Sequence, residues 1–387
     1  MGMLSPTDFA LAKWLLTEGK ALPRLDELVD ALCTQLRALG IPVDRAIVST
    51  RTLHAVYLSY FRIWRSDGNS VSDTYDRDEE NMGYFERSPI RVVMETGRPV
   101  ELLLEETADD AFGIVPDLKA DGYVHYLCAP LRFSDGTLNH LSFATKAPGG
   151  FRPDHIATLL QMEPALASAL EIRMLRRAMV DTLQTYLGDE PGRRVAQGDI
   201  VRGQVSEIEA AILFADLRGF TANSMQLGNT TLVQWLNAYY ACIVPAVEQH
   251  GGDVLKLIGD GVLAIFPERE GDAPQRALAA ARDAQAAIAL ANGQGLDWPR
   301  LNVGIALHAG TAAYGNVGSL QRLDFTVIGR DVNLASRISA VCRDTGEPIL
   351  MSKRFRDRLG REAYRLGPYA LPGVPDRVNV YRPFDDV

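Results

Sequence analysis

The sequence predicts an α+β protein with two domains that are joined by a helix. At 387 residues the chain is long enough for two domains, each with an ample core. Short apolar runs typical of strands occur in both halves, together with segments of helical periodicity. Between the halves, apolar residues recur at spacings of three or four, which indicates an amphipathic connecting helix. The predicted parts are residues 1–165, a connecting helix and linker over 166–205, and residues 206–387.

The N-terminal part mixes helices and strands. Helical periodicity covers Leu25–Leu39, and strand patterns cover Ala46–Thr52 and Ala55–Trp64. Asp135-Gly136 lies between two further strand patterns, which predicts a hairpin. Those two strands are Gly122–Leu131 and Leu138–Ala144. The first 160 or so residues are therefore expected to form an α+β domain.

The connecting helix has an apolar stripe, made of Ile172, Leu175, Met179, Leu183 and Tyr186. In a dimer this stripe could pair as a short coiled coil and transmit a signal, although a helix packed on its own domain would show the same pattern. The Gly- and Arg-rich segment 188–203 is expected to be a linker. Residues 366–383 are expected to form a closing pair of strands.

Composition limits the classes of function. A formal net charge of −9 argues against general nucleic-acid binding. No segment reaches the run of about 18 apolar residues that spans a membrane, and the N-terminus lacks a signal-peptide pattern. We therefore expect no membrane partner and a cytoplasmic location. The cysteines lack CxxC spacing and are expected to be reduced, mostly buried thiols. They are Cys33, Cys128, Cys242 and Cys342.

Two acidic residues stand at the ends of apolar strand patterns in the C-terminal half. Asp216 follows the run Ala211–Ala215, and Asp260 lies between the runs Val254–Ile258 and Val262–Phe266. A carboxylate beside such runs is costly unless it is paired or bound to a cation. The two aspartates therefore suggest a divalent-metal site, which substrate phosphates would complete. An N-cap at Asp216 and a plain hairpin turn at Asp260 are the alternative interpretation.

The segment Asp324–Arg337 combines a strand pattern with a helix pattern. The strand ends at Gly329, and Asp331 is the expected N-cap of the helix. Asn333 and Arg337 are four residues apart, so they share one helix face. An amide and a guanidinium on one face can hold a ribose and a phosphoryl oxygen, although residues of these types usually belong to a solvated face.

Four segments of the chain, FADLRGFT, GGDVLKLIGDG, GIALHAGTAAYGNVGS and TVIGRDVNLASR, occur in the order and spacing of the class III adenylyl and guanylyl cyclases. Residues 206–352 resemble the catalytic domain of that family. The resemblance implies a ferredoxin-like α+β fold. The run Tyr126–Leu159 resembles the closing half of a GAF sensor domain, which implies a small-molecule ligand for the N-terminal domain.

The resemblance also implies roles for single residues. Asp216 and Asp260 match the two metal-binding aspartates of the family, and the backbone carbonyl of Leu217 would add a ligand. Phe220 and Thr221 match positions that approach the triphosphate. The implied cofactor is Mg²⁺ or Mn²⁺, with two ions in each site.

The remaining matched positions concern the base and the transition state. Lys256 and Thr326 match the base-recognising positions; lysine with threonine resembles the adenylyl set, whereas guanylyl members tend to carry Glu and Cys. Asn333 and Arg337 match the pair that orients the ribose and stabilises the transition state. Asp324 lies on the same strand face as Thr326 and could share in reading the base.

By this resemblance the chain is an adenylate cyclase that converts ATP to 3′,5′-cyclic AMP and pyrophosphate, under control of the N-terminal domain. One metal ion would lower the pKa of the ribose 3′-hydroxyl, which attacks the α-phosphate, and the other would bind the triphosphate. In the family the aspartates come from one subunit and the other functional residues from its partner, so a homodimer with shared sites is implied. Thr311 stands where some members carry an additional phosphate-binding Arg.

Three other functions fit parts of the pattern. A guanylate cyclase would use the same scaffold. A non-catalytic dimeric sensor would have the same fold, but all six matched functional positions are filled here. A diguanylate cyclase shares a Gly-Gly-Asp element, yet Gly251-Gly252-Asp253 is followed by Val-Leu-Lys rather than by that family's Glu-Phe.

Overall fold

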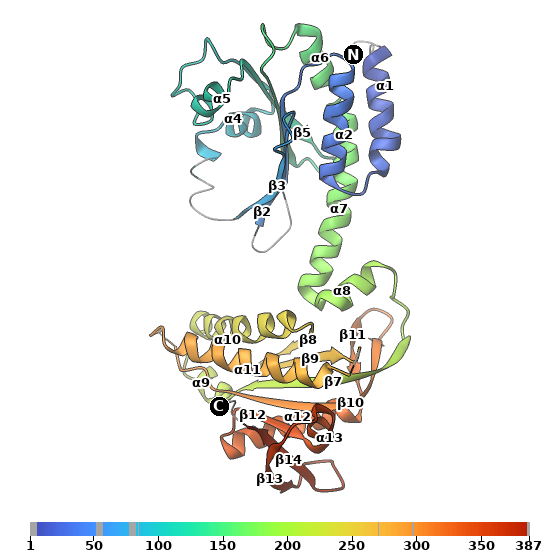
Figure 1. The fold of residues 1–387 in the computed structure, drawn as a ribbon, viewed down its shortest axis with the longest axis vertical. Coiled ribbons are helices and arrows are strands. Elements are labelled where there is room, and N and C mark those ends of the chain that lie inside the picture. Colours follow the sequence, from blue (N-terminus) through green and yellow to red (C-terminus); the bar gives the residue numbers. More distant parts are fainter. Residues whose placement is uncertain are drawn as a thin grey trace. The chain divides into compact units, whose positions relative to one another are not determined.

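The structure, a computed structural model, describes residues 6–51, 57–76, 83, 85–269, 271–295 and 298–384. It divides into two compact units, Met1–Thr182 and Leu183–Val387 (Figure 1). Each unit contains a sheet together with helices, so the predicted α+β class is confirmed for both. The predicted end of one strand at Thr52 and start of the next at Ala55 lie outside the described residues.

The N-terminal unit is built on a six-stranded antiparallel sheet with the order β3-β2-β1-β6-β5-β4. Its strands are β1 (Arg45–Arg51), β2 (Tyr57–Arg65), β3 (Val71–Asp76), β4 (Val100–Leu103), β5 (His125–Arg132) and β6 (Leu138–Thr145). Strands β5 and β6 pair in the predicted hairpin around Asp135-Gly136. Its helices are α1 (Pro6–Trp14), the π-helical turn η1 (Leu15–Gly19), α2 (Leu25–Ala38), α4 (Pro89–Thr96), α5 (Val115–Ala120) and α6 (Pro153–Gln161).

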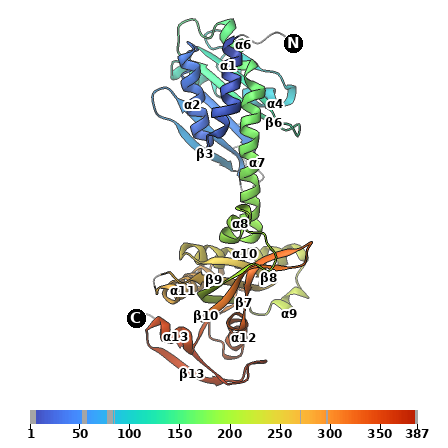
Figure 2. The same ribbon diagram turned by 90° about the vertical axis from the view of Figure 1, so that its right-hand side faces the viewer.

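The two faces of this sheet are covered by different helices (Figures 1 and 2). Ala46 and Val48 of β1 belong to the core that α1, α2, α6 and the first half of α7 (Glu163–Leu187) complete. Tyr126 and Cys128 of β5 belong to a second core under α4 and α5. Because strand residues alternate between faces, Arg45 lies on the face of this second core.

The first part of the segment predicted as a connecting helix lies in α7. Most of its apolar stripe is exposed: Ile172, Leu175 and Met179 are 46, 63 and 48% exposed, and Tyr186 is 84% exposed. A coiled coil between copies stays a prediction. Part of the segment expected as a linker is helical instead, as α8 (Asp189–Ala196). Helix α8 forms because it has acidic residues in its first turn and arginines in its last, which suits the helix dipole.

The C-terminal unit contains an eight-stranded sheet in the order β13-β14-β12-β10-β7-β9-β8, with β11 paired to β10. Its strands are β7 (Val205–Leu217), β8 (Asp253–Ile258), β9 (Gly261–Pro267), β10 (Val303–Gly318), β11 (Leu323–Ile328), β12 (Ile349–Ser352), β13 (Ala363–Tyr369) and β14 (Val378–Pro383). Its helices are α9 (Phe220–Ser224), α10 (Asn229–Gln249), α11 (Ala273–Asn292), α12 (Arg330–Thr345) and α13 (Lys353–Leu359). The expected closing strand pair is present as β13 and β14.

The centre of this unit has the chain order β7-α10-β8-β9-α11-β10 and the spatial strand order β10-β7-β9-β8. This β-α-β-β-α-β arrangement is ferredoxin-like. Helices α10 and α11 pack on one face of the sheet, against alternate residues of β7 such as Leu213. Asp216 points to the other face, toward α12, because its side chain follows the opposite alternation.

Two glycines permit close approaches near the site. Gly188 has a φ of +93°, and a Cβ at this position would lie 2.4 Å from the carbonyl oxygen of Val254. Because glycine has no Cβ, the end of α7 can pack on β8. At Gly310 a Cβ would lie 2.1 Å from the Asp331 carboxylate. That carboxylate accepts a hydrogen bond from the Thr311 N–H at 2.8 Å. The expectation that Asp331 is the N-cap is therefore wrong. Helix α12 begins at Arg330, its N-cap is Gly329, and Asp331 lies inside the first turn.

Other expectations concern the thiols and the membrane. All four cysteines are buried and free, as expected. In the part of the chain that the structure describes, we find no helix with the length and apolar character that crossing a membrane requires.

Candidate active site

The two predicted metal-binding aspartates meet at one edge of the sheet. Asp216 is the penultimate residue of β7, and Asp260 lies in the two-residue turn that joins β8 to β9. The sheet register pairs Asp216 with Gly261. The backbone N–H of Leu217 donates to the carbonyl oxygen of Asp260 at 3.1 Å. The β8–β9 hairpin therefore places two residues that are 44 positions apart in the sequence beside each other.

The charges at this edge favour a cation. Burial raises the pKa of Asp260, and the negative charge of Asp216 raises it further. Two carboxylates and a main-chain carbonyl are oxygen donors of the kind that Mg²⁺ and Mn²⁺ bind. Among the described residues there is no group of three or more His, Cys, Asp or Glu side chains that could hold a metal ion. Asp216, Asp260 and the Leu217 carbonyl thus fit a divalent ion whose other ligands are water or substrate.

A cation of the protein itself already contacts Asp216. The Arg343 guanidinium, in the last turn of α12, donates to the Asp216 carboxylate at 2.8 Å. The side chain of Arg343 is 63% exposed, whereas that of Asp216 is 13% exposed. Arg343 is exposed enough to move away, so it can exchange with a metal ion. Its sequence context, a polar helix face, carries no signal of this contact.

We expect the Arg343→Gln substitution to tighten metal binding, because the ion no longer competes with a guanidinium. An exposed ion pair is worth about 0.2–1 kcal/mol, so the dissociation constant for Mn²⁺ should fall up to about fivefold. Electron paramagnetic resonance of free Mn²⁺, without nucleotide, measures this constant. Arg358→Gln is the matched control, since Arg358 forms a similar ion pair with Glu209 away from the aspartates. Equal constants for the wild type and both variants would rule out the competition.

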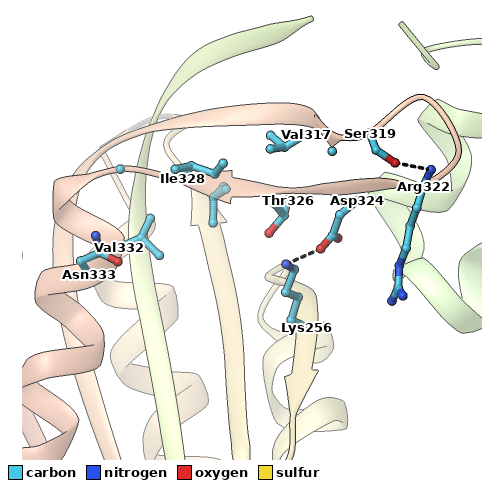
Figure 3. Close-up of a pocket in the computed structure, with 12 residues that line it drawn as sticks. Lys256, Val317, Ser319, Arg322, Asp324, Thr326, Ile328, Val332 and Asn333 are labelled. Carbon is cyan, nitrogen blue, oxygen red and sulfur yellow. Dashed lines mark hydrogen bonds and ion pairs between the residues drawn. The ribbon is translucent and has the colours of Figure 1, made fainter. Parts of the chain in front are cut away.

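A separate cavity of about 620 Å³ contains the residues predicted to read the base (Figure 3). It lies where β8, the β10–β11 hairpin and the start of α12 meet. Its lining is Lys256, Val317, Gly318, Ser319, Arg322, Asp324, Thr326, Val327, Ile328, Gly329, Val332 and Asn333. Three of the six matched functional positions, Lys256, Thr326 and Asn333, thus share one cavity.

The polar groups of the cavity are held by the local fold. The Lys256 ammonium forms an ion pair with the Asp324 carboxylate, which explains how a lysine is tolerated in an apolar strand. Thr326 is buried and lies two residues after Asp324 on β11, so both face the cavity (Figure 3). The hairpin between β10 and β11 is closed by the Ser319 N–H, which donates to the Arg322 carbonyl at 2.8 Å.

Asn333 and Arg337 occupy successive turns of one face of α12, as predicted. Both side chains are exposed. In the described part of the chain, the Arg337 guanidinium has no hydrogen bond or ion pair. It is therefore available to a ligand. The sequence spacing was sufficient to predict this shared face, whereas the exposure of the guanidinium comes from the tertiary structure.

The metal aspartates and the base cavity do not meet within one chain. Asp216 pairs with Gly304, near the start of β10. Thr326 pairs with Gly315, near its end. These two positions are 11 residues apart on β10. Lys256 of the cavity, however, is only four residues before Asp260 on the β8–β9 hairpin, which is on the order of 13 Å along the strand. None of the residues at the aspartate edge lines the cavity.

The segment after β7 carries Phe220 and Thr221, the positions predicted to approach the triphosphate. Phe220 begins α9 after Gly219, whose φ is +78°. Its ring stacks on the buried Trp235, with ring centroids 6.3 Å apart. Thr221 is exposed. The stacking fixes the turn directly after the aspartate edge, so these two residues lie near Asp216 rather than near the base cavity.

The histidines of this unit have structural contacts. His308 is buried, and its Nδ1 lies 2.7 Å from the Ser352 hydroxyl. It also neighbours the Asp331 carboxylate and lowers its pKa. His250 caps the C-terminal end of α10 and lies 2.7 Å from Asp283. Neither histidine lines the base cavity.

Comparison with known proteins shows which proteins this unit resembles. Residues 204–381 match the adenylate and guanylate cyclase catalytic domain. An adenylate cyclase of Anabaena cylindrica is 34% identical over 214 residues, which are 52% of this chain and 42% of that protein. The adenylyl cyclase CyaB from P. aeruginosa has 26% identity and a TM-score of 0.42, covering 48% of this chain and 97% of that one. The guanylyl cyclase Cya2 has 30% identity and a TM-score of 0.42, and the match covers 46% of this chain and 92% of that one.

Residues 204–381 of the C-terminal unit are therefore similar to the adenylate and guanylate cyclase catalytic domain. The chain spans less than half of the length of the Anabaena cyclase that it matches. The names of the similar proteins include both adenylyl and guanylyl cyclases.

Proposed function

We propose that the chain is an adenylate cyclase that converts ATP to 3′,5′-cyclic AMP and pyrophosphate in a homodimer with shared active sites. The observation that carries this proposal is the cavity in which Lys256, Thr326 and Asn333 converge. A lysine ammonium offers only donors, and a threonine hydroxyl can donate or accept. Adenine presents an acceptor at N1 beside a donor at its 6-amino group, which suits this pair. Guanine presents a donor at N1, which would face the ammonium unfavourably.

Asp324 is a further member of the base site in this proposal. Its ion pair holds the Lys256 side chain in the cavity (Figure 3). The carboxylate can also accept a hydrogen bond from an exocyclic amine. The lysine, the hydroxyl and the carboxylate then surround the edge of the base from two strands, β8 and β11.

The reaction forms a bond between the ribose 3′-oxygen and the α-phosphorus and breaks the bond to the leaving pyrophosphate. Asn333 would hold the ribose, and the free Arg337 guanidinium would neutralise charge that develops on the phosphoryl oxygens. Asp216, Asp260 and the Leu217 carbonyl would hold Mg²⁺ or Mn²⁺. Such ions lower the pKa of the 3′-hydroxyl and stabilise the triphosphate. Phe220 and Thr221 would lie beside the triphosphate.

Two observations support the homodimer. Asp216 and Asp260 do not line the cavity that contains Lys256, Thr326 and Asn333, so the two groups of residues are separate within one chain. In a dimer with two active sites, the aspartates of one copy would complete the active site that contains the base cavity of the other copy. Most of the apolar stripe of α7 is exposed, and the same second copy would cover it as a short coiled coil.

The N-terminal unit is proposed to be a GAF-like sensor that regulates the cyclase domain. Its six-stranded sheet has helices on both faces, which is compatible with a ligand-binding domain. Helix α7 continues from this unit into the cyclase unit. A ligand of the sensor would act through this helix.

Incubation of the purified chain with ATP or GTP and Mg²⁺ or Mn²⁺, followed by chromatography, tests the proposed reaction. Cyclic AMP from ATP is the expected product. Cyclic GMP as the main product would identify a guanylate cyclase instead. No cyclic product with either nucleotide or metal would leave a non-catalytic sensor.

The base cavity leads to a prediction about substrate choice. We expect the double substitution Lys256→Glu with Thr326→Cys to move the preference from ATP toward GTP by about tenfold or more, since one well-placed base contact is worth about 1–3 kcal/mol. The ratio of kcat/KM for the two nucleotides measures the change. Lys353→Glu, which alters an exposed lysine on α13, is the control. An unchanged ratio in the double variant would contradict the assignment of the cavity to the base.

A further inference from the structure

The N-terminal unit buries an arginine that has no partner. Arg45, the first residue of β1, is 8% exposed, and its Nη1 is fully buried without a hydrogen-bond partner. Among the described residues, the Arg45 guanidinium has no ion pair and no hydrogen bond. Its electrostatic neighbours are Tyr126, Tyr123, Arg65 and Tyr75. The buried guanidinium is therefore surrounded by phenol rings and by another cation.

A second arginine lies close to Arg45, and a lysine contacts Tyr123, which is a neighbour of Arg45. Arg65 is directly opposite it across the β1–β2 ladder. Lys146 follows β6 and holds its ammonium 4.8 Å from the centre of the Tyr123 ring. Arg65 and Lys146 also lack carboxylate partners in the described chain. The positive charges of Arg65 and Lys146 act on the carboxylate of Asp67. Asp67 is fully exposed, and its carboxylate lies beyond ion-pair distance of both side chains.

This arrangement is unfavourable without a counter-ion. A buried unpaired charge costs several kcal/mol, and like charges directly opposite on a sheet repel. Burial lowers the pKa of Arg45, but a guanidinium stays protonated in proteins. In contrast, Arg62 on the other face of β2 has an ordinary partner, since its guanidinium holds both carboxylate oxygens of Asp30 at 2.7 and 2.8 Å.

We infer that Arg45, Arg65 and Lys146 form an anion site that accepts the phosphate group of a small ligand. A phosphate dianion matches three cations better than a single carboxylate does, and the planar forks of two arginines suit its oxygens. Tyr123 stands beside Arg65 and under Lys146, so its ring can flank the organic part of the ligand. The site does not depend on the cyclase reaction.

Hydrogen exchange of the full chain with and without inorganic phosphate tests the inference. Tyr123 and Lys146 lie just outside the strands, where exchange is measurable. Phosphate is expected to protect the peptides that contain these two residues in the wild type and in Arg62→Gln. The protection should be lost in Arg45→Gln and weakened in Arg45→Lys, which keeps the charge but not the fork. Phosphate bound at the cyclase unit would protect other peptides, and that protection would persist in the Arg45 variants.

The stability of the variants supplies a second measurement. Without phosphate, Arg45→Gln is expected to unfold no earlier than the wild type, because it removes an unpaired buried charge. Arg62→Gln is expected to unfold earlier, because it leaves Asp30 unpaired. Unfolding of Arg45→Gln below the wild-type temperature would overturn the inference. So would equal phosphate protection in Arg45→Gln, an absence of protection in the wild type, or protection by acetate in place of phosphate.

Discussion

Removal of either aspartate that is proposed to bind metal is expected to abolish turnover. Asp216→Ala, Asp216→Asn, Asp260→Ala and Asp260→Asn should each lower kcat by about 100-fold or more. A bound metal contributes several kcal/mol of charge stabilisation, and each 1.4 kcal/mol is about a factor of ten in rate. The asparagine variants keep the size of the side chain and remove only its charge, so they separate metal binding from packing. Production of cyclic AMP from ATP measures the effect.

The control for this prediction is Asp283→Ala, which removes an exposed carboxylate on α11 that pairs with His250. It should keep full activity. Size-exclusion chromatography should show the same assembly for all variants. Retention of more than about a tenth of the activity by an asparagine variant would contradict the proposed role of that aspartate, since loss of a metal ligand costs more than one factor of ten.

Mixing two inactive variants is expected to restore activity. If Asp216 and Arg337 of one site belong to different chains, Asp216→Ala and Arg337→Ala are each inactive alone. A mixed dimer then has one site with both lesions and one site with neither. With random exchange of subunits, roughly a quarter of the wild-type activity should return, because half of the dimers hold one intact site. A fluorescence assay of subunit exchange is run on the same samples.

A matched pair of variants controls this experiment. Asp216→Ala mixed with Asp260→Ala carries both lesions on the same half of the site, so each site of the mixed dimer stays broken. No activity should return in that mixture. If subunits exchange and the first mixture also stays inactive, both residues act within one chain. The proposal of a shared site would then be wrong.

Local sequence patterns were sufficient for much of the cyclase unit. The position of Asp260 between two apolar runs suggested a hairpin turn, and the structure contains the β8–β9 hairpin. The spacing of Asn333 and Arg337 predicted their common helix face. These predictions depend on short-range rules, the period of a strand or helix and the conformational demands of a tight turn. Helix α8 was missed because glycine and arginine suggested a linker, while the ion pairs of Glu190 with Arg193 and Arg194 help to hold it.

The sequence by itself determined the α+β class, and it predicted the candidate site residues and the connecting helix. Only the tertiary structure showed that Arg343 pairs with Asp216, that Asp331 is turned toward Thr311, and that Arg45 is buried without a partner. These facts depend on contacts between residues far apart in the chain, which no local period encodes. The separation of the aspartate edge from the base cavity likewise follows from sheet register, because pairing decides which residues become neighbours.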